Sequence, residues 1–163
     1  MQNNDVLDAL AAAERSFERT PETIEEGLDV DDAELIQLRR ACRLLAAATL
    51  LRERGYYTVV IESSFVAIER TIQFRLVHDG ALGPSEVISS HRRLYQYGAE
   101  AGLFDDTFAD DLAELWNQNR TKTYYRLGLA TEGQATAMQD LATAVHSHLV
   151  GESRVSYECI CGD

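Results

Sequence analysis

The chain has 163 residues, of which 45% are hydrophobic, and its 15 basic residues against 27 acidic ones give a formal net charge of −12. This length predicts one domain, large enough to bury a core without disulfides or metals. Such an acidic surface repels nucleic acid at long range, so any site for RNA or a nucleotide must be a local basic pocket. The few lysines and many carboxylates also suit a high-salt cytoplasm, where salt would screen the charge.

The cysteine count and the N-terminal residues indicate the compartment. Three cysteines are an odd number, which argues against a secreted disulfide framework. Asp8 interrupts the apolar residues between Val6 and Leu10, so this segment lacks the apolar core of a signal peptide. No apolar run approaches the length needed to span a bilayer. We therefore expect a soluble, cytoplasmic protein that does not enter the membrane.

Helical periodicity dominates the chain, with apolar residues at three- or four-residue spacing between capping residues and glycines. Thr20 followed by Pro21 indicates a short helical turn that Gly27 closes. The β-branched run 58–61 is compatible with a strand, but the helical spacing around it continues too far for that. The longer helices predicted in chain order cover residues 6–17, 31–55, 57–80, 83–95, 105–126 and 131–151.

The apolar faces and short loops predict an all-α fold, an antiparallel bundle of five to six helices. Residues 1–30 are expected to form an N-terminal helical extension, 31–150 the bundle and 151–163 a C-terminal tail. Cys42 falls on the apolar stripe of the second predicted helix, so we expect it in the core.

One segment departs from the acidic character of the chain. Residues 119–126 read Asn-Arg-Thr-Lys-Thr-Tyr-Tyr-Arg and follow directly on an apolar-periodic helix. Arginine and lysine hold phosphate, and tyrosine stacks on a base or donates a hydrogen bond. This segment is therefore the predicted functional site.

The order of several segments resembles HEPN domains. The leucine-rich stretch 50–57 ends in a glycine and two tyrosines, and a helix of small and aromatic residues follows at 60–69. The resemblance continues through His91-Arg92-Arg93-Leu94 and the region 105–128, and it ends with the last predicted helix. It covers about two-thirds of the chain, from about residue 44 to residue 150, and implies a HEPN-like fold.

The resemblance implies an antiparallel helical bundle that forms a homodimer with a cleft between the copies. Many HEPN proteins are endoribonucleases, often toxins paired with a nucleotidyltransferase-type antitoxin. Their motif is an arginine, a polar residue and, a few residues later, a histidine. Arg120 and Thr121 match its first two positions, and Tyr125 stands where the histidine is expected.

A phenol, with an ordinary pKa of ~10, is far from the value that suits proton transfer at neutral pH. We therefore predict a catalytically degenerate HEPN-like homodimer that binds RNA, a nucleotide or a protein partner. One alternative is a metal-independent endoribonuclease toxin in which Arg120 stabilises the phosphate transition state and Tyr125 or His91 moves protons. The other is a purely structural interaction module.

The predicted binding residues surround Arg120. On an ideal α-helix Tyr124 lies over Arg120, whereas Arg120 and Tyr125 converge only across a dimer or after a helix break. His91 takes the place of the missing histidine if the bundle brings it near Arg120. The structural alternative is that the basic residues pair with neighbouring carboxylates. The predicted set comprises His91, Asn117, Asn119, Arg120, Lys122, Tyr124 and Arg126.

The last helix and the tail contain metal-ligand residue types at unfavourable spacing. His146 and His148 are two residues apart on a helix, so they point to nearly opposite faces. Cys159 and Cys161 are separated by one residue rather than the usual two. We therefore predict no metal centre and no cofactor, and interpret the two cysteines as tail thiols.

Overall fold

The computed structural model describes residues 3–20, 23–124 and 128–162. These residues form six α-helices and no strand, which confirms the predicted all-α bundle. Among them, no helix is both long enough and apolar enough to cross a membrane. The elements in chain order are α1 (Asn3–Glu18), α2 (Ala33–Glu53), α3 (Tyr57–His78), α4 (His91–Glu100), α5 (Asp106–Gln118), a π-helical turn (Asn119–Tyr124), α6 (Glu132–Gly151) and a 3-10 turn (Ser156–Glu158).

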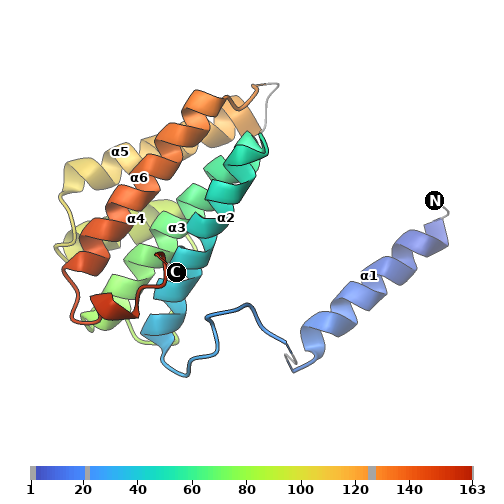
Figure 1. Ribbon diagram of the computed structural model, residues 1–163, viewed down its shortest axis with the longest axis horizontal. Coiled ribbons are helices and arrows are strands. Elements are labelled where there is room, and N and C mark those ends of the chain that lie inside the picture. The colour runs from blue at the N-terminus through green and yellow to red at the C-terminus, as the bar shows by residue number, and fades with distance from the viewer. Residues whose placement is uncertain (1–2, 21–22, 125–127, 163) are drawn as a thin grey trace.

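Helices α2 and α3 form an antiparallel hairpin that is closed by a tight turn at Gly55 (Figure 1). Gly55 has a φ of 79°, in the left-handed region where glycine meets no steric penalty. The N–H groups of Gly55 and Tyr56 donate to the carbonyls of Arg52 and Leu51, each at 3.0 Å. These bonds satisfy two carbonyl groups in the last turn of α2 and reverse the direction of the chain, so that α3 runs antiparallel to α2.

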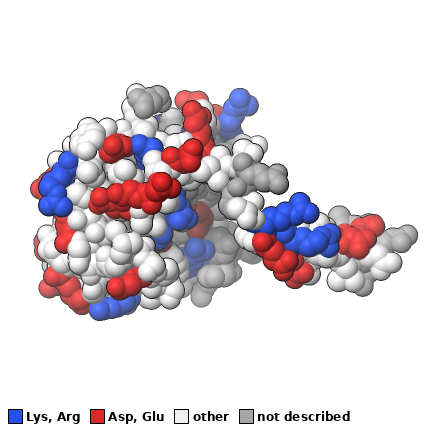
Figure 2. Space-filling view, turned by 90° about the horizontal axis from the view of Figure 1, so that it is seen from below, with Lys and Arg blue, Asp and Glu red and all other residues white. Residues whose placement is uncertain are grey.

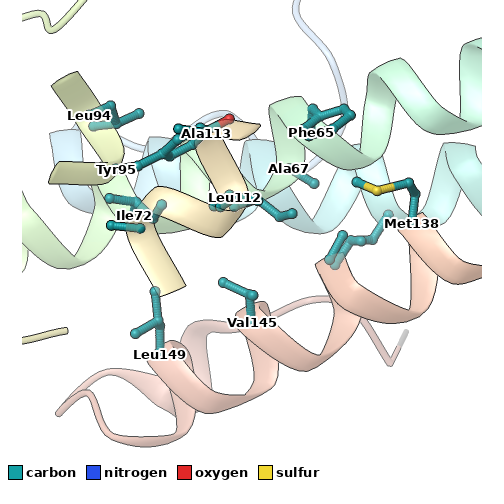
Figure 3. Packing of buried hydrophobic residues seen from close by; sticks show 14 of the residues in the cluster. Phe65, Ala67, Ile72, Leu94, Tyr95, Leu112, Ala113, Met138, Val145 and Leu149 are labelled. Carbon is teal, nitrogen blue, oxygen red and sulfur yellow. The ribbon is translucent and has the colours of Figure 1, made fainter. Parts of the chain in front are cut away.

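Helix α3 is the central element, because it packs against α2, α6 and α4, while α4 in turn pairs with α5. Figure 3 shows apolar side chains from α3, α4, α5 and α6 converging on a shared interior. The predicted apolar stripe of α3 is buried, which confirms a helix rather than a strand in this segment; its members are Ile61, Phe65, Ile68, Ile72 and Leu76.

Two details of the predicted secondary structure were wrong, one a helix start and the other a helical turn. Helix α4 begins at His91 rather than at residue 83, because the side chain of Ser90 caps it by accepting from the N–H of Arg93. Residues 84–90 are not helical: Val87 is 84% exposed, and only Ile88 among their apolar side chains packs against the core. The predicted short helical turn that Gly27 closes lies partly outside the described residues, at 21–22, and the described residues 23–27 form an irregular segment and a non-helical turn.

Helix α1 forms where the apolar spacing predicts it, but it lies away from the bundle at the end of an extended connection (Figure 1). Its apolar residues remain open to solvent: Leu7 is 54% exposed, Leu10 55% and Phe17 92%. The single chain therefore leaves the apolar face of α1 uncovered.

Candidate functional site

A polar cluster joins α3, α4 and α5 around the indole of Trp116. The middle of α3 supplies two carboxylates, the start of α4 supplies an imidazole and a phenol, and the end of α5 leads into the π-helical turn with its arginine. We call this group the Trp116 cluster; it comprises Glu62, Glu69, His91, Tyr95, Trp116, Asn119 and Arg120.

Arg120 is held between a carboxylate and the indole ring. Its Nη2 donates to Glu62 Oε2 at 2.9 Å, and its guanidinium carbon lies 4.9 Å from the centre of the Trp116 ring. Asn119 donates from Nδ2 to the other carboxylate oxygen of Glu62, also at 2.9 Å. Both side chains of the Arg120–Glu62 ion pair are only partly exposed, at 20% and 26%. The pair therefore fixes the guanidinium in place against the aromatic surface.

His91 reaches the same indole from α4. Its ring stacks on Trp116 with a centroid separation of 4.1 Å and an interplanar angle of 26°. Its Nδ1 is hydrogen-bonded to Glu69 Oε1, which also accepts from the hydroxyl of Tyr95 at 2.9 Å. Glu69 is only 6% exposed, so these two partners satisfy a carboxylate that would be costly to bury alone.

Tyr95 is fully buried, and its environment fixes its protonation. Burial raises the pKa of the Tyr95 phenol far above its ordinary value, and the neighbouring Glu69 carboxylate raises it further. The hydroxyl therefore remains a hydrogen-bond donor at any physiological pH, and it acts as a fixed support for Glu69.

A pocket of about 300 Å³ opens beside the stacked rings of His91 and Trp116. Its lining combines cationic, aromatic and amide groups; the residues are Ser90, His91, Arg92, Tyr95, Ala113, Trp116 and Asn117. This volume lies at the lower end of the range for small-molecule sites. Arg120 does not line the pocket but touches its indole wall from the π-helical turn.

The structure thus brings together four of the predicted binding residues: His91 and Asn117 line the pocket, and Asn119 and Arg120 pair with Glu62. The segment after α5 is a π-helix rather than the α-helix assumed in placing Tyr124 over Arg120. Such wide turns are rare and are frequent at functional sites. The side chains of Lys122 and Tyr124, and all of Tyr125 and Arg126, lie outside the description.

Sequence reasoning did not identify Glu62, Glu69, Tyr95 or Trp116 as parts of this site. One signal was present, because Glu69 occupies a helical position flanked by the apolar stripe of α3. A carboxylate buried there requires polar partners from another element.

A second group of chemically active side chains lies between α2, α6 and the C-terminal tail. We call it the Cys/His cluster; it comprises Cys42, His146, Cys159 and Cys161, whose thiol and imidazole atoms all lie within 4.8 Å of one another. Cys42 comes from α2 and His146 from α6, whereas both other cysteines come from the tail. None of the three cysteines forms a disulfide.

The contacts within the cluster alter the acidity of its thiols. A hydrogen bond from Cys161, followed by the influence of His146, lowers the pKa of the Cys42 thiol to about 4 against the opposing effect of burial. The hydrogen bond to Cys42, followed by burial, raises the pKa of Cys161, and burial raises that of Cys159. These contacts therefore favour the thiolate form of the buried Cys42 over those of the two tail cysteines.

Sequence reasoning did not find this cluster, because it looked for ligands within short segments. The expectation that His146 and His148 point apart holds: the first is 4% exposed as a whole residue, and the side chain of the second is 59% exposed. Cys42 is buried, as predicted, but it also contacts both His146 and Cys159. Thiolate and imidazole groups are ligands that zinc accepts.

Comparison with known proteins identifies the family of this chain. A family model described as "Domain of unknown function (DUF8154)" matches residues 1–161, so the chain belongs to that family. Neither the curated proteins nor the solved structures contain a significant match to the chain.

Proposed function

We propose that this protein is a HEPN-like homodimer that binds RNA or a nucleotide at the pocket beside Trp116. The observation that carries the proposal is that Arg120 and His91, from different helical segments, both lie against the Trp116 indole. His91 and Trp116 both line the pocket and offer aromatic contact to a base there, and arginine suits phosphate recognition. Arg92 and Asn117 at the pocket add a cation and an amide.

The charge of the chain as a whole favours a local site over a broad interface. Figure 2 shows basic side chains interspersed among acidic ones on the face it displays, in keeping with a formal net charge of −12. Binding must therefore depend on the few cations at the pocket and beside it, Arg92 in its lining and Arg120 against its indole wall, and its affinity must fall as salt rises. The ion pair with Glu62 also provides a purely structural explanation for Arg120, which the experiment has to separate from binding.

The chain carries its own probe, because Trp116 is its sole tryptophan. We expect short single-stranded RNA or a nucleoside monophosphate to quench its fluorescence in a saturable, salt-sensitive manner. Arg120→Ala should abolish the saturable change, whereas Arg93→Ala, which removes an exposed arginine paired with Glu100, should leave it intact. Titrations with ribose-free bases and with inorganic phosphate separate stacking from phosphate recognition. The proposal is contradicted if the unaltered protein shows no quenching, or if Arg120→Ala and Arg93→Ala are quenched equally.

The position of His91 supports a second candidate, a metal-independent endoribonuclease. The predicted catalytic partner of Arg120 is Tyr125, but the structure brings His91 to the same indole as Arg120. An imidazole is better suited to proton transfer near neutral pH than a phenol. Cleavage of RNA without added metal, lost in both His91→Ala and Arg120→Ala, is the result this candidate requires. RNA that stays intact with the unaltered protein rules it out.

The proposed homodimer has support from the uncovered apolar face of α1. Phe17 and its apolar neighbours are exposed in the single chain, and a second copy would bury them. Light scattering at working concentration should give twice the mass of one chain. A monomer contradicts the dimeric part of the proposal, while the fluorescence titration still tests the pocket. A nucleotidyltransferase-type partner is the further association that the resemblance implies.

A further inference from the structure

The Cys/His cluster takes no part in the proposed binding site, yet it gathers all three cysteines of the chain beside one buried histidine. Its members come from three places in the sequence, and the fold brings them together. Cys42 and His146 are presented by helices that pack in the bundle, and they are 1% and 4% exposed. Cys159 and Cys161 arrive from the tail on the solvent side.

Four of the six ligand-atom separations within the cluster are close to those around a tetrahedral zinc ion, and all six are within 4.8 Å. Zinc bonds of about 2.3 Å to sulfur and about 2.0–2.1 Å to nitrogen place two sulfur ligands ~3.8 Å apart and a sulfur ~3.6 Å from a nitrogen. The sulfurs of Cys42 and Cys159 are 3.6 Å apart. His146 Nε2 lies 3.6 Å from Cys42 Sγ, 3.5 Å from Cys159 Sγ and 3.2 Å from Cys161 Sγ.

The hydrogen bonds of His146 leave the correct nitrogen available as a ligand. Its Nδ1 is 3.0 Å from Thr71 Oγ1, and that hydroxyl is 2.8 Å from the carbonyl of Ala67. Because a carbonyl only accepts, the Thr71 hydroxyl donates its single proton to Ala67 and accepts from His146 Nδ1–H. A neutral imidazole then has its lone pair on Nε2, which faces the three sulfurs. Such a bond from the distant ring nitrogen orients metal-binding histidines in general.

We propose that Cys42, His146, Cys159 and Cys161 hold one zinc ion as a structural centre that fastens the C-terminal tail to α2 and α6. Three thiolates and one imidazole complete a tetrahedron, so the centre has no open position for a substrate. Cys161 is exposed, which gives the ion a path of entry from solvent. Binding releases the protons that the thiols still carry.

Other contacts show that the tail is seated where this centre requires it. Glu158, directly before Cys159, forms a 2.6 Å ion pair with Arg39 of α2. Ile160, between the two tail cysteines, joins a small core cluster with Leu38, Phe74 and Val150. It also approaches Gly27 so closely that a Cβ added there would lie 2.6 Å from Ile160 Cδ1. The zinc centre therefore also secures the connection that precedes α2.

Metal analysis of untagged protein, purified without immobilised metal, tests the proposal. We expect one zinc ion per chain by inductively coupled plasma mass spectrometry, and loss of that zinc in His146→Ala. The matched control is His148→Ala, which removes an exposed histidine two residues along the same helix and should keep the full zinc content.

Because His146 is buried, its replacement could prevent folding, so Cys161→Ser provides an independent variant at an exposed position. Cobalt(II) added to the apoprotein should give the intense visible bands of a tetrahedral thiolate site, and these bands should weaken in a Cys161→Ser protein that keeps its helical circular dichroism. Unaltered protein that holds no zinc after refolding with zinc overturns the proposal. So does a stoichiometric content of iron, or equal zinc loss in His146→Ala and His148→Ala.

Discussion

His146 and His91 show how neighbouring atoms give one residue type two different chemistries. His146 Nε2 faces three sulfurs, and its Nδ1 is anchored by Thr71. His91 is instead bonded to a carboxylate through Nδ1 and stacks on Trp116 beside a pocket. The first environment concentrates negative charge on soft ligands and suits a metal cation, whereas the second suits an aromatic or anionic ligand from solvent. The two histidines differ in the atoms that they contact, and their positions in the sequence do not reveal this difference.

The largest effect should follow from Cys42→Ser, which removes the most buried thiol of the Cys/His cluster. Loss of the metal and of a buried partner should lower the thermal midpoint by roughly 10 °C, since ~3 kcal/mol corresponds to such a shift in a domain of this size. Thermal circular dichroism of the zinc-loaded proteins measures it. Nucleotide-induced quenching of Trp116 at low temperature should persist, because the two clusters use different residues. An unchanged midpoint would count against the structural role of the zinc centre.

Tyr95→Phe should have the next largest effect, at the Trp116 cluster. It removes the hydroxyl that supports the buried carboxylate of Glu69 and should lower the free energy of unfolding by about 1–2 kcal/mol. Urea denaturation measures the loss. Tyr97→Phe is the control, because that hydroxyl donates to the carbonyl of Ala81 at an exposed position. Equal losses of unfolding free energy in both variants would show that the bond to Glu69 stabilises the fold no more than the exposed bond to Ala81. The zinc content should not change in either variant.

Glu62→Gln distinguishes a binding arginine from a structural one. The substitution keeps the shape of the side chain but removes the negative charge that repels a phosphate beside Arg120. We expect nucleotide affinity to rise about five-fold, or ~1 kcal/mol, in the fluorescence titration. Glu114→Gln, at an exposed site on α5, should leave the affinity unchanged. Weaker binding in Glu62→Gln would mean that Glu62 positions Arg120 more than it competes for it.

The smallest effect should come from the start of α6, away from both clusters. Thr131 and Gln134 form a reciprocal capping box there. Thr131→Ala should cost about 1 kcal/mol of unfolding free energy, measured by urea denaturation. Zinc content and nucleotide binding should stay as in the unaltered protein. If either falls, the folding of α6 as a whole limits that site, and the two clusters are less independent than the structure indicates.

Much of the fold could be predicted because local signals and packing agree. The stripe from Ile61 to Leu76 gave α3 correctly, since five apolar residues at helical spacing are all buried. Helix α6 likewise begins directly after residue 131, the predicted start, because Thr131 and Gln134 form a capping box there. The start of α4 was misjudged, because Pro84 is a valid first-turn residue but Ser90 provides the actual cap. The rule that proline favours the first turn of a helix therefore gave the wrong start for α4.

The sites were harder to predict, because their members meet only through the packing of helices. Arg120 was identified from the basic character of its own segment, but its partner Glu62 is far away in the sequence. Cys42 and Cys159 are likewise distant, and their meeting depends on how the tail returns across α2. Periodicity places a residue on one face of a helix; it does not say which other helix that face meets.

X-ray absorption at the zinc edge of the purified, zinc-loaded protein tests the contrast between the two histidine environments most directly. The account predicts a first shell of three sulfurs at about 2.3 Å and one nitrogen at about 2.0–2.1 Å, as expected for the Cys/His cluster. A shell made only of nitrogen and oxygen would place the metal on surface histidines or carboxylates, and would contradict the assignment of His146 to a zinc centre.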